Sequence, residues 1–174
     1  MFGHGPLGCL LAMVAGARKC RVILVGKRGW RLDRVSGLRI ADCVDATASA
    51  DVVAELRAMT DGHGPEVTID ATGRPEMWEQ AIAAVGRGGS VVFFGGCAPG
   101  TSVQVDTRRA HYEELTLVGA FHHTPELIRQ AVESLESGTI VPDALVTHRM
   151  RLDGVHAALD LMQKGEALKV LIEP

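Results

Sequence analysis

The chain begins with MFGHGPLG, residues 1–8, in which Gly3, Gly5 and Gly8 have the spacing G-x-G-x-x-G. This spacing is typical of the turn between a parallel strand and a helix at which the pyrophosphate of a dinucleotide binds. Gly3 permits the tight turn, Gly5 lets the backbone approach the pyrophosphate, and Gly8 lets the helix pack closely. Only two residues precede the motif, so we interpret them as the end of a truncated strand.

The residues that follow alternate short apolar runs with segments of helical periodicity, which predicts βα units in a doubly wound parallel sheet. Helices are expected at residues 6–17, 30–38, 51–60, from 75 onward, 124–137 and 153–164. Strands are expected at 20–26, 43–45, 67–70, 90–94, 115–121, 145–152 and 169–174. The runs 20–26, 90–94 and 115–121 predict buried strands, because strands covered on both faces are continuously apolar. Ser49 or Asp51 is the expected cap of the third helix.

Length, net charge and the absence of long apolar runs limit the classes to which the protein can belong. The 174 residues suit one ordinary domain with a real core. The net charge of −3 lacks the basic footprint of a nucleic-acid partner. No apolar run approaches the roughly 18 residues of a membrane helix, and no targeting pattern is visible, so we expect a cytoplasmic protein without a membrane partner.

Cysteine and histidine spacing does not predict a metal site in this chain. The four cysteines have no zinc-site spacing, so free thiols are expected. His122 and His123 are adjacent and point to opposite faces of an extended segment. His4 lies inside the glycine turn, where a contact with a phosphate and a solvated side chain are the two alternatives.

The end of the second expected strand indicates which dinucleotide binds. A carboxylate normally stands there to accept hydrogen bonds from the ribose 2′-hydroxyl of NAD. This chain has Gly26 instead, followed by Lys27, Arg28 and Arg31. No carboxylate would repel a 2′-phosphate, and three cations are available to bind one, which predicts a preference for NADP over NAD. The alternative is a solvated basic loop that has no part in selectivity.

Loops after the later strands are expected to line the nicotinamide, because ligands bind outside the carboxyl ends of parallel strands. These loops are ATG at 71–73, GGCAP at 95–99 and GAFHH at 119–123. Their glycines and small residues would let a cofactor approach. The alternative is that they are only turns.

Six segments, in order, carry a family resemblance: GHGPLG, VILVGKRGWRLD, DGHGPEVTIDATG, GRGGSVVFFGG, LTLVGAFHHTPELIRQAVESLESG and EALKVLIEP. Together they resemble the medium-chain, zinc-dependent alcohol dehydrogenases, with the polyol and threonine dehydrogenase branch the nearest. The resemblance implies a Rossmann domain at residues 1–144 and a segment, 145–174, that packs on a catalytic domain. That domain normally precedes the Rossmann domain and holds the zinc, so the family's zinc ligands have no matching positions here.

The resemblance also implies roles for single residues. The positions matching the pyrophosphate site are Gly3, Gly5, Pro6, Leu7 and Gly8. Gly26 stands at the usual position of the ribose-binding aspartate, and Arg31 matches a basic position near the adenosine ribose. The positions matching the nicotinamide site are Thr72, Gly95, Ala120 and Phe121. No catalytic residue is assigned to this chain.

The implied activity is hydride transfer between a small secondary alcohol or polyol and NADP or NAD, with zinc polarising the oxygen. Residues 1–174 alone are expected to be inactive, and edge-to-edge pairing into a homo-oligomer is a further expectation. A standalone nucleotide-binding module without catalysis is the alternative from another class. The zinc-independent quinone and enoyl reductases are a third, but their turn usually reads A-x-x-G-G-V-G, unlike GHGPLG.

Overall fold

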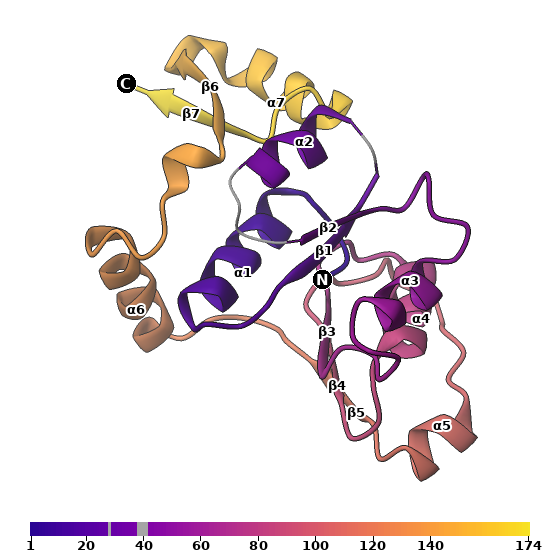
Figure 1. Cartoon of the computed structure of the whole chain (residues 1–174). Helices are drawn as coiled ribbons and strands as arrows, with labels where there is room; N and C mark the ends of the chain where they lie inside the picture. Colours follow the sequence, from indigo (N-terminus) through magenta and orange to yellow (C-terminus); the bar gives the residue numbers. More distant parts are fainter. Residues whose placement is uncertain (28, 38–41) are drawn as a thin grey trace.

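Five short strands form the core of the computed structural model, which describes residues 1–27, 29–37 and 42–174 (Figure 1). They are β1 (Ile23–Gly26), β2 (Asp42–Asp45), β3 (Val67–Asp70), β4 (Ser90–Phe93) and β5 (Thr116–Gly119). β1 pairs with β2, and β3, β4 and β5 pair in that order, all in parallel.

The N-terminal residues join these two groups of strands. Phe2 forms parallel bridges with Val25 of β1 and with Asp70 of β3. On the β3 side, the Phe2 N–H donates to the carbonyl of Ile69 (2.8 Å) and the Phe2 carbonyl accepts from Ala71 N–H (2.9 Å). The sheet order is therefore β2, β1, residues 1–3, β3, β4, β5. This confirms the predicted Rossmann-type parallel sheet.

Helices cover both faces of this sheet, as a doubly wound fold requires. The helices are α1 (Pro6–Ala17), α2 (Trp30–Gly37), α3 (Val52–Ala58), α4 (Pro75–Ala84), α5 (Thr107–Tyr112), α6 (Pro125–Glu136) and α7 (Val155–Lys164). Ile23 and Val25 pack with the buried residues of α3 and α4, whereas Leu24 packs with those of α1 and α2. The two groups of helices lie on opposite sides of β1 in Figure 1.

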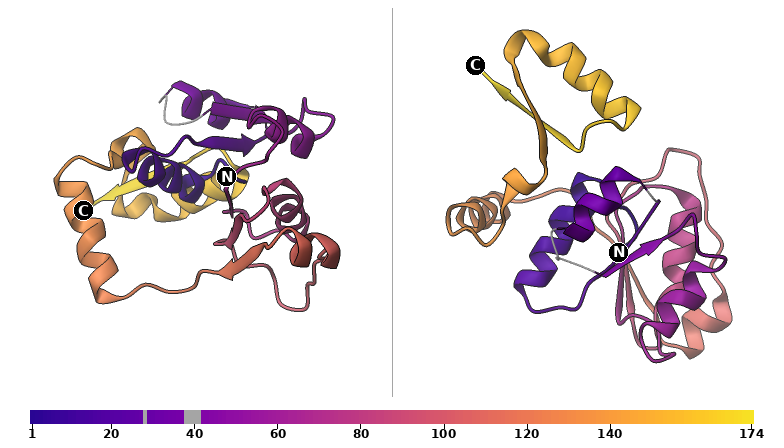
Figure 2. Two further views of the ribbon diagram at one scale, coloured as in Figure 1. Left: turned by 60° about the horizontal axis from the view of Figure 1, so that its bottom comes forward. Right: turned by 45° about the horizontal axis from the view of Figure 1, so that its top comes forward.

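A second, two-stranded sheet follows at the C-terminal end of the chain. β6 (Val146–Arg151) and β7 (Lys169–Glu173) are parallel and are connected through α7. This unit stands beside the main sheet in Figure 2. Leu145 and Leu168 anchor it, because both are buried in the cluster that contains α1 and β1. A short 3₁₀ turn, Pro142–Ala144, precedes the unit.

Local signals set the helix ends. α1 spans the predicted residues and begins at a proline, which suits the first helical position. The Asp51 carboxylate accepts from the Ala54 N–H (3.0 Å), so Asp51 and not Ser49 caps α3. Thr124 caps α6 in the same way through the Leu127 N–H (3.2 Å). None of the described helices is long and apolar enough to cross a membrane.

The structure differs from the sequence-based expectations for two strands and contains a helix that was not expected. The run 90–94 predicts a buried strand, but in β4 only Val91 is buried, the other three residues are half-buried, and Phe94, after the strand, is exposed. The apolar run at 115–121 predicts a buried strand, but all four residues of β5 are exposed. β5 is the outer strand next to β4, and α6 stands away from it (Figure 2), with Leu127, Ile128, Val132 and Leu135 also exposed. The sequence does not predict α5, because its six residues offer little apolar periodicity.

Candidate functional site

The three glycines of the first turn differ in what surrounds them. Gly3 has φ +109°, and a Cβ there would lie 3.0 Å from Cγ2 of Thr72. A Cβ at Gly8 would lie 1.9 Å from the carbonyl oxygen of Gly3. A Cβ at Gly5 would have no heavy atom within 4 Å. The turn therefore needs glycine at positions 3 and 8 for packing, while position 5 faces open space.

This open space lies at the N-terminus of α1. Gly5 is the N-cap residue and has no side chain to satisfy the first N–H groups, and Pro6 has no N–H to offer. Helix geometry leaves the N–H groups of Leu7 and Gly8 without intrahelical acceptors. The positive end of this twelve-residue helix therefore faces open space with unpaired backbone N–H groups, and this arrangement suits an anionic ligand.

Asp70, at the end of β3, holds the second loop of the site. Its carboxylate is fully buried and accepts from the Thr72 hydroxyl (2.7 Å), the Thr72 N–H (3.1 Å) and the Gly73 N–H (2.9 Å). Gly95, two residues after β4, packs against the same loop, since a Cβ there would lie 2.3 Å from the Gly73 nitrogen and 2.9 Å from Oδ2 of Asp70. Residues 71–73 and 95 thus form one fixed edge beside Gly3.

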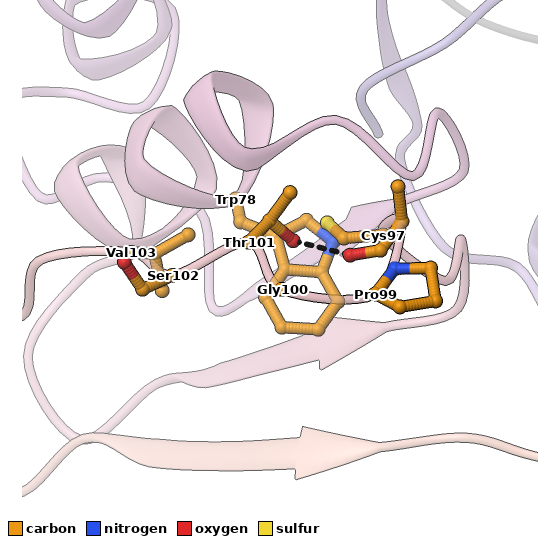
Figure 3. A pocket seen from close by; sticks show the side chains of 8 residues that line it. Trp78, Cys97, Pro99, Gly100, Thr101, Ser102 and Val103 are labelled. Atoms are coloured by element: carbon orange, nitrogen blue, oxygen red, sulfur yellow. Dashed lines mark hydrogen bonds between the residues drawn. The ribbon is translucent and has the colours of Figure 1, made fainter.

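Trp78, on α4, supports this edge from behind. Its indole N–H donates to the carbonyl of Gly95 (3.1 Å), and its ring stacks on Phe93 with a centroid distance of 3.9 Å. Trp78 and residues 97–103 line a pocket of about 330 Å³, in which Cys97, Pro99 and Thr101 surround the indole (Figure 3). No sequence motif singles out Trp78 or Asp70. The signal for Asp70 is its position directly before ATG.

His4 occupies the space over Gly26 at the end of β1. A Cβ at Gly26 would lie 2.5 Å from Cγ and 2.6 Å from Nδ1 of the His4 ring. The His4 ring is partly buried and therefore not fully solvated. Burial lowers the pKa of His4, and the positive charges of Arg31 and Lys27 lower that pKa further. Gly26 thus lies against the His4 ring, and Lys27 and Arg31 act on the ring electrostatically, whereas Arg28 lies outside the described residues.

Arg31 is anchored to the C-terminal part of the chain. Its Nη2 donates to the carbonyl of Ala167 (2.7 Å), and its guanidinium carbon lies 5.5 Å from the centroid of the Trp30 ring. Its Nε is buried and has no hydrogen-bond partner within the described structure. Residues 145–174 therefore help to hold a side chain that the resemblance places near the adenosine ribose.

Two predicted residues lie at the outer edge of the site. The Ala120 N–H donates to the carbonyl of Phe93 (3.1 Å), which places Ala120 at the end of β5. Phe121 is 88% exposed, and its ring contacts the ring of His122 (3.8 Å between centroids). Gly3, Thr72 and Gly95 thus lie close together, whereas Phe121 makes no contact with them in the described residues.

Metal-ligating side chains are scattered in the described part of the chain. No three of its His, Cys, Asp or Glu residues lie close enough to hold a metal ion. None of the four cysteines, which all belong to the described residues, forms a disulfide, and Cys9 is fully buried in α1.

Comparison with known proteins gives consistent matches. The family described as zinc-binding dehydrogenase matches residues 6–137. The chain is 30% identical over its full length to D-arabinitol dehydrogenase 1 of Uromyces fabae, and 29% identical over 99% of its length to L-threonine 3-dehydrogenase of Bacillus licheniformis. It spans half the length of each of these relatives. A solved protein of Sinorhizobium meliloti 1021, bound to NADP, is 26% identical with a TM-score of 0.85; the match covers 99% of this chain and 51% of that one.

Proposed function

The chain belongs to the zinc-binding dehydrogenase family, and we propose that it binds NADP or NAD as the cofactor-binding part of an alcohol dehydrogenase. The resemblance seen in the sequence motifs is confirmed by this family match and by the polyol and threonine dehydrogenase relatives. Since the chain spans half of those relatives, hydride transfer between a secondary alcohol or polyol and the nicotinamide is part of the proposal.

The observation that carries the proposal is the open space at Gly5. A pyrophosphate there would meet the free N–H groups of Leu7 and Gly8 at the positive end of α1. We assign Gly3, Gly5, Pro6, Leu7 and Gly8 to the pyrophosphate. When bound, the cofactor supplies the hydride-accepting ring, and the chain positions it.

For the nicotinamide we propose the edge formed by Thr72 and Gly95, continued by Ala120 and Phe121. Asp70 supports this assignment, because its hydrogen bonds hold the Thr72 loop in one conformation next to Gly3. A rigid edge at the carboxyl ends of β3 and β4 suits a planar ring that has to be held at a fixed position.

For the nucleotide we propose a preference for NADP. Gly26 offers no carboxylate to a ribose diol, and the positive charges of Lys27 and Arg31 act electrostatically on the His4 ring that covers it. A 2′-phosphate would be favoured there, as charge-assisted hydrogen bonds are stronger than neutral ones. The Sinorhizobium meliloti relative bound to NADP is consistent with this choice. Arg28 is included by its place in the sequence.

For the organisation of the complete protein we propose a Rossmann domain at residues 1–144 and a segment, 145–174, that packs on a catalytic domain. We assign no zinc ligand to this chain, and the zinc of the family is proposed to lie in that catalytic domain. A small alcohol is the proposed substrate. Edge-to-edge pairing of copies through β5 is proposed because all four residues of this outer strand are exposed.

The test is cofactor binding by the whole chain, measured by isothermal titration with NADP⁺ and NAD⁺. Gly5→Val should abolish binding and leave the far-ultraviolet circular dichroism unchanged, because the new side chain enters open space at an ordinary φ of −75°. Gly16→Val, at the exposed far end of α1, is the matched control. A parent chain that binds neither nucleotide would overturn the proposal, and unchanged binding by Gly5→Val would overturn its location.

A further inference from the structure

We propose that His4 is a specificity-determining residue of the cofactor site, and that it acts as one unit with Gly26. Its ring fills the place of the carboxylate that would bind a ribose diol, and it offers an N–H donor to a 2′-phosphate. This inference rests on the proposed function, since it requires the chain to bind NADP or NAD.

Steric coupling between positions 4 and 26 is the first support. Gly26 is buried, and three atoms of His4, the Cβ, Cγ and Nδ1, lie within 3 Å of the point that a Cβ at position 26 would occupy. Real Cβ contacts of this length do not occur. Any larger residue at position 26 must therefore displace the His4 ring, so a carboxylate at 26 and the ring in its present place exclude each other.

The position of the ring relative to the turn is the second support. His4 stands between Gly3 and Gly5, so its backbone belongs to the segment that meets the pyrophosphate. In this fold the adenosine ribose lies between that segment and the end of the next strand, which here is Gly26 of β1. The ring that covers Gly26 therefore lies where the 2′ side of the ribose is expected.

The charges around the ring are the third support. Arg31, from α2, and Lys27, from the loop after β1, both act on His4 electrostatically. Arg31 is held in place by Ala167, and its Nε has no acceptor in the described structure. A dianionic 2′-phosphate that accepts from the imidazole N–H would also be attracted by these two positive charges. A ribose hydroxyl would gain much less from the same groups.

The experiment is a double-mutant cycle on the whole chain with His4→Ala, Gly26→Asp and the double variant. Binding of NADP⁺, NAD⁺, 2′-AMP and 5′-AMP is measured by isothermal titration. His4→Ala should weaken NADP⁺ and 2′-AMP about tenfold, the effect of one charge-assisted hydrogen bond, and leave NAD⁺ and 5′-AMP within about twofold. His4→Gln, which keeps an N–H donor, should recover part of the loss.

The double variant decides whether the two positions form a unit. Gly26→Asp alone should not gain NAD⁺ binding, because the new side chain and the His4 ring compete for the same space, whereas the double variant should bind NAD⁺ at least about tenfold more tightly than the parent chain. Additive effects, or equal weakening of NADP⁺ and NAD⁺ by His4→Ala, would overturn the inference. His63→Ala, at an exposed loop histidine before β3, is the matched control. A parent chain that binds no dinucleotide would instead overturn the proposed function.

Discussion

At Gly8, helix α1 packs directly against Gly3, whose carbonyl oxygen lies 1.9 Å from the point that a Cβ at position 8 would occupy. Because the obstacle is backbone, it cannot rotate away as a flexible side chain could. Gly8→Ala should therefore lower the free energy of unfolding by about 2–3 kcal/mol, through overpacking and displacement of the helix. Urea unfolding followed by circular dichroism measures this change. Gly5→Ala is the control, with an expected loss under about 1 kcal/mol, and similar losses at the two positions would contradict the packing described.

Asp70 should stabilise the fold at the edge that we propose for the nicotinamide. In Asp70→Asn, one carboxylate oxygen becomes an NH₂ group that faces hydrogen-bond donors in a fully buried place. We expect a loss of about 2–3 kcal/mol in the free energy of unfolding, typical of a buried charged acceptor. Thr72→Val, which removes only the hydroxyl, should cost about 1 kcal/mol. Urea unfolding of both variants checks that Asp70→Asn loses more stability than Thr72→Val. An Asp70→Asn variant as stable as the parent chain would contradict the role of Asp70.

Arg109, on α5, should stabilise the end of α4. Its guanidinium donates to the carbonyls of Ile82, Ala83 and Val85 (2.9 Å each) and pairs with Glu113. These carbonyls end a helix and lack intrahelical donors. Arg109→Ala should therefore lower the free energy of unfolding by about 2–3 kcal/mol. The loss should appear as a lower midpoint of thermal unfolding. The neighbouring exposed Arg108→Ala should change stability by less than about 0.5 kcal/mol, and equal effects of the two variants would exclude the capping role.

In a polypeptide that consists of residues 1–174, the α-amino group of Met1 should make stability depend on pH. Burial lowers the pKa of this group to about 5, from 8.0 in an unfolded chain. Between these values the unfolded state binds more protons than the folded state, so stability rises as pH increases from 5 to 8. Below pH 5 the full penalty is present, and the expected difference is about 4 kcal/mol at most. Urea unfolding at pH 5 and pH 8 measures it.

An N-acetylated chain is the control for this pH dependence. Acetylation removes the titrating amine but keeps an N–H that can donate to the Ile23 carbonyl, which the amine contacts at 2.7 Å. The histidine contributions are common to both chains, so the difference between the two pH profiles reports Met1 alone. Identical profiles for the free and acetylated chains would show that the amine is not buried as described.

Much of the fold could be predicted from the sequence because its signals are local. Pro6 at a first helical turn and the caps Asp51 and Thr124 set helix starts through contacts within a few residues. The β-branched runs predict the strands, although β1 begins at Ile23 and not at Cys20, whose side chain is exposed. The exposure of β5 depends on where α6 lies, which no local signal of β5 records.

The candidate site could be predicted only where a motif marks it. The glycine spacing locates the turn, but the contact between His4 and Gly26 joins residues that are far apart along the chain. The same is true of Asp70 and Gly95 and of Arg31 and Ala167. Which side chains meet across strand ends depends on sheet register, and a single sequence does not give that register.

Residues 1–3 join the two halves of the main sheet and also lead directly into the glycine turn. A nucleotide that holds Gly3 and Gly5 therefore also holds β1 and β3 to the segment between them. If the nucleotide binds at this turn as proposed, we expect ligand binding and closure of the sheet to be thermodynamically linked, because the ligand would favour the state in which this short segment is in place. Amide hydrogens at the centre of the sheet should then exchange more slowly in the bound chain than in the free chain, even far from the ligand.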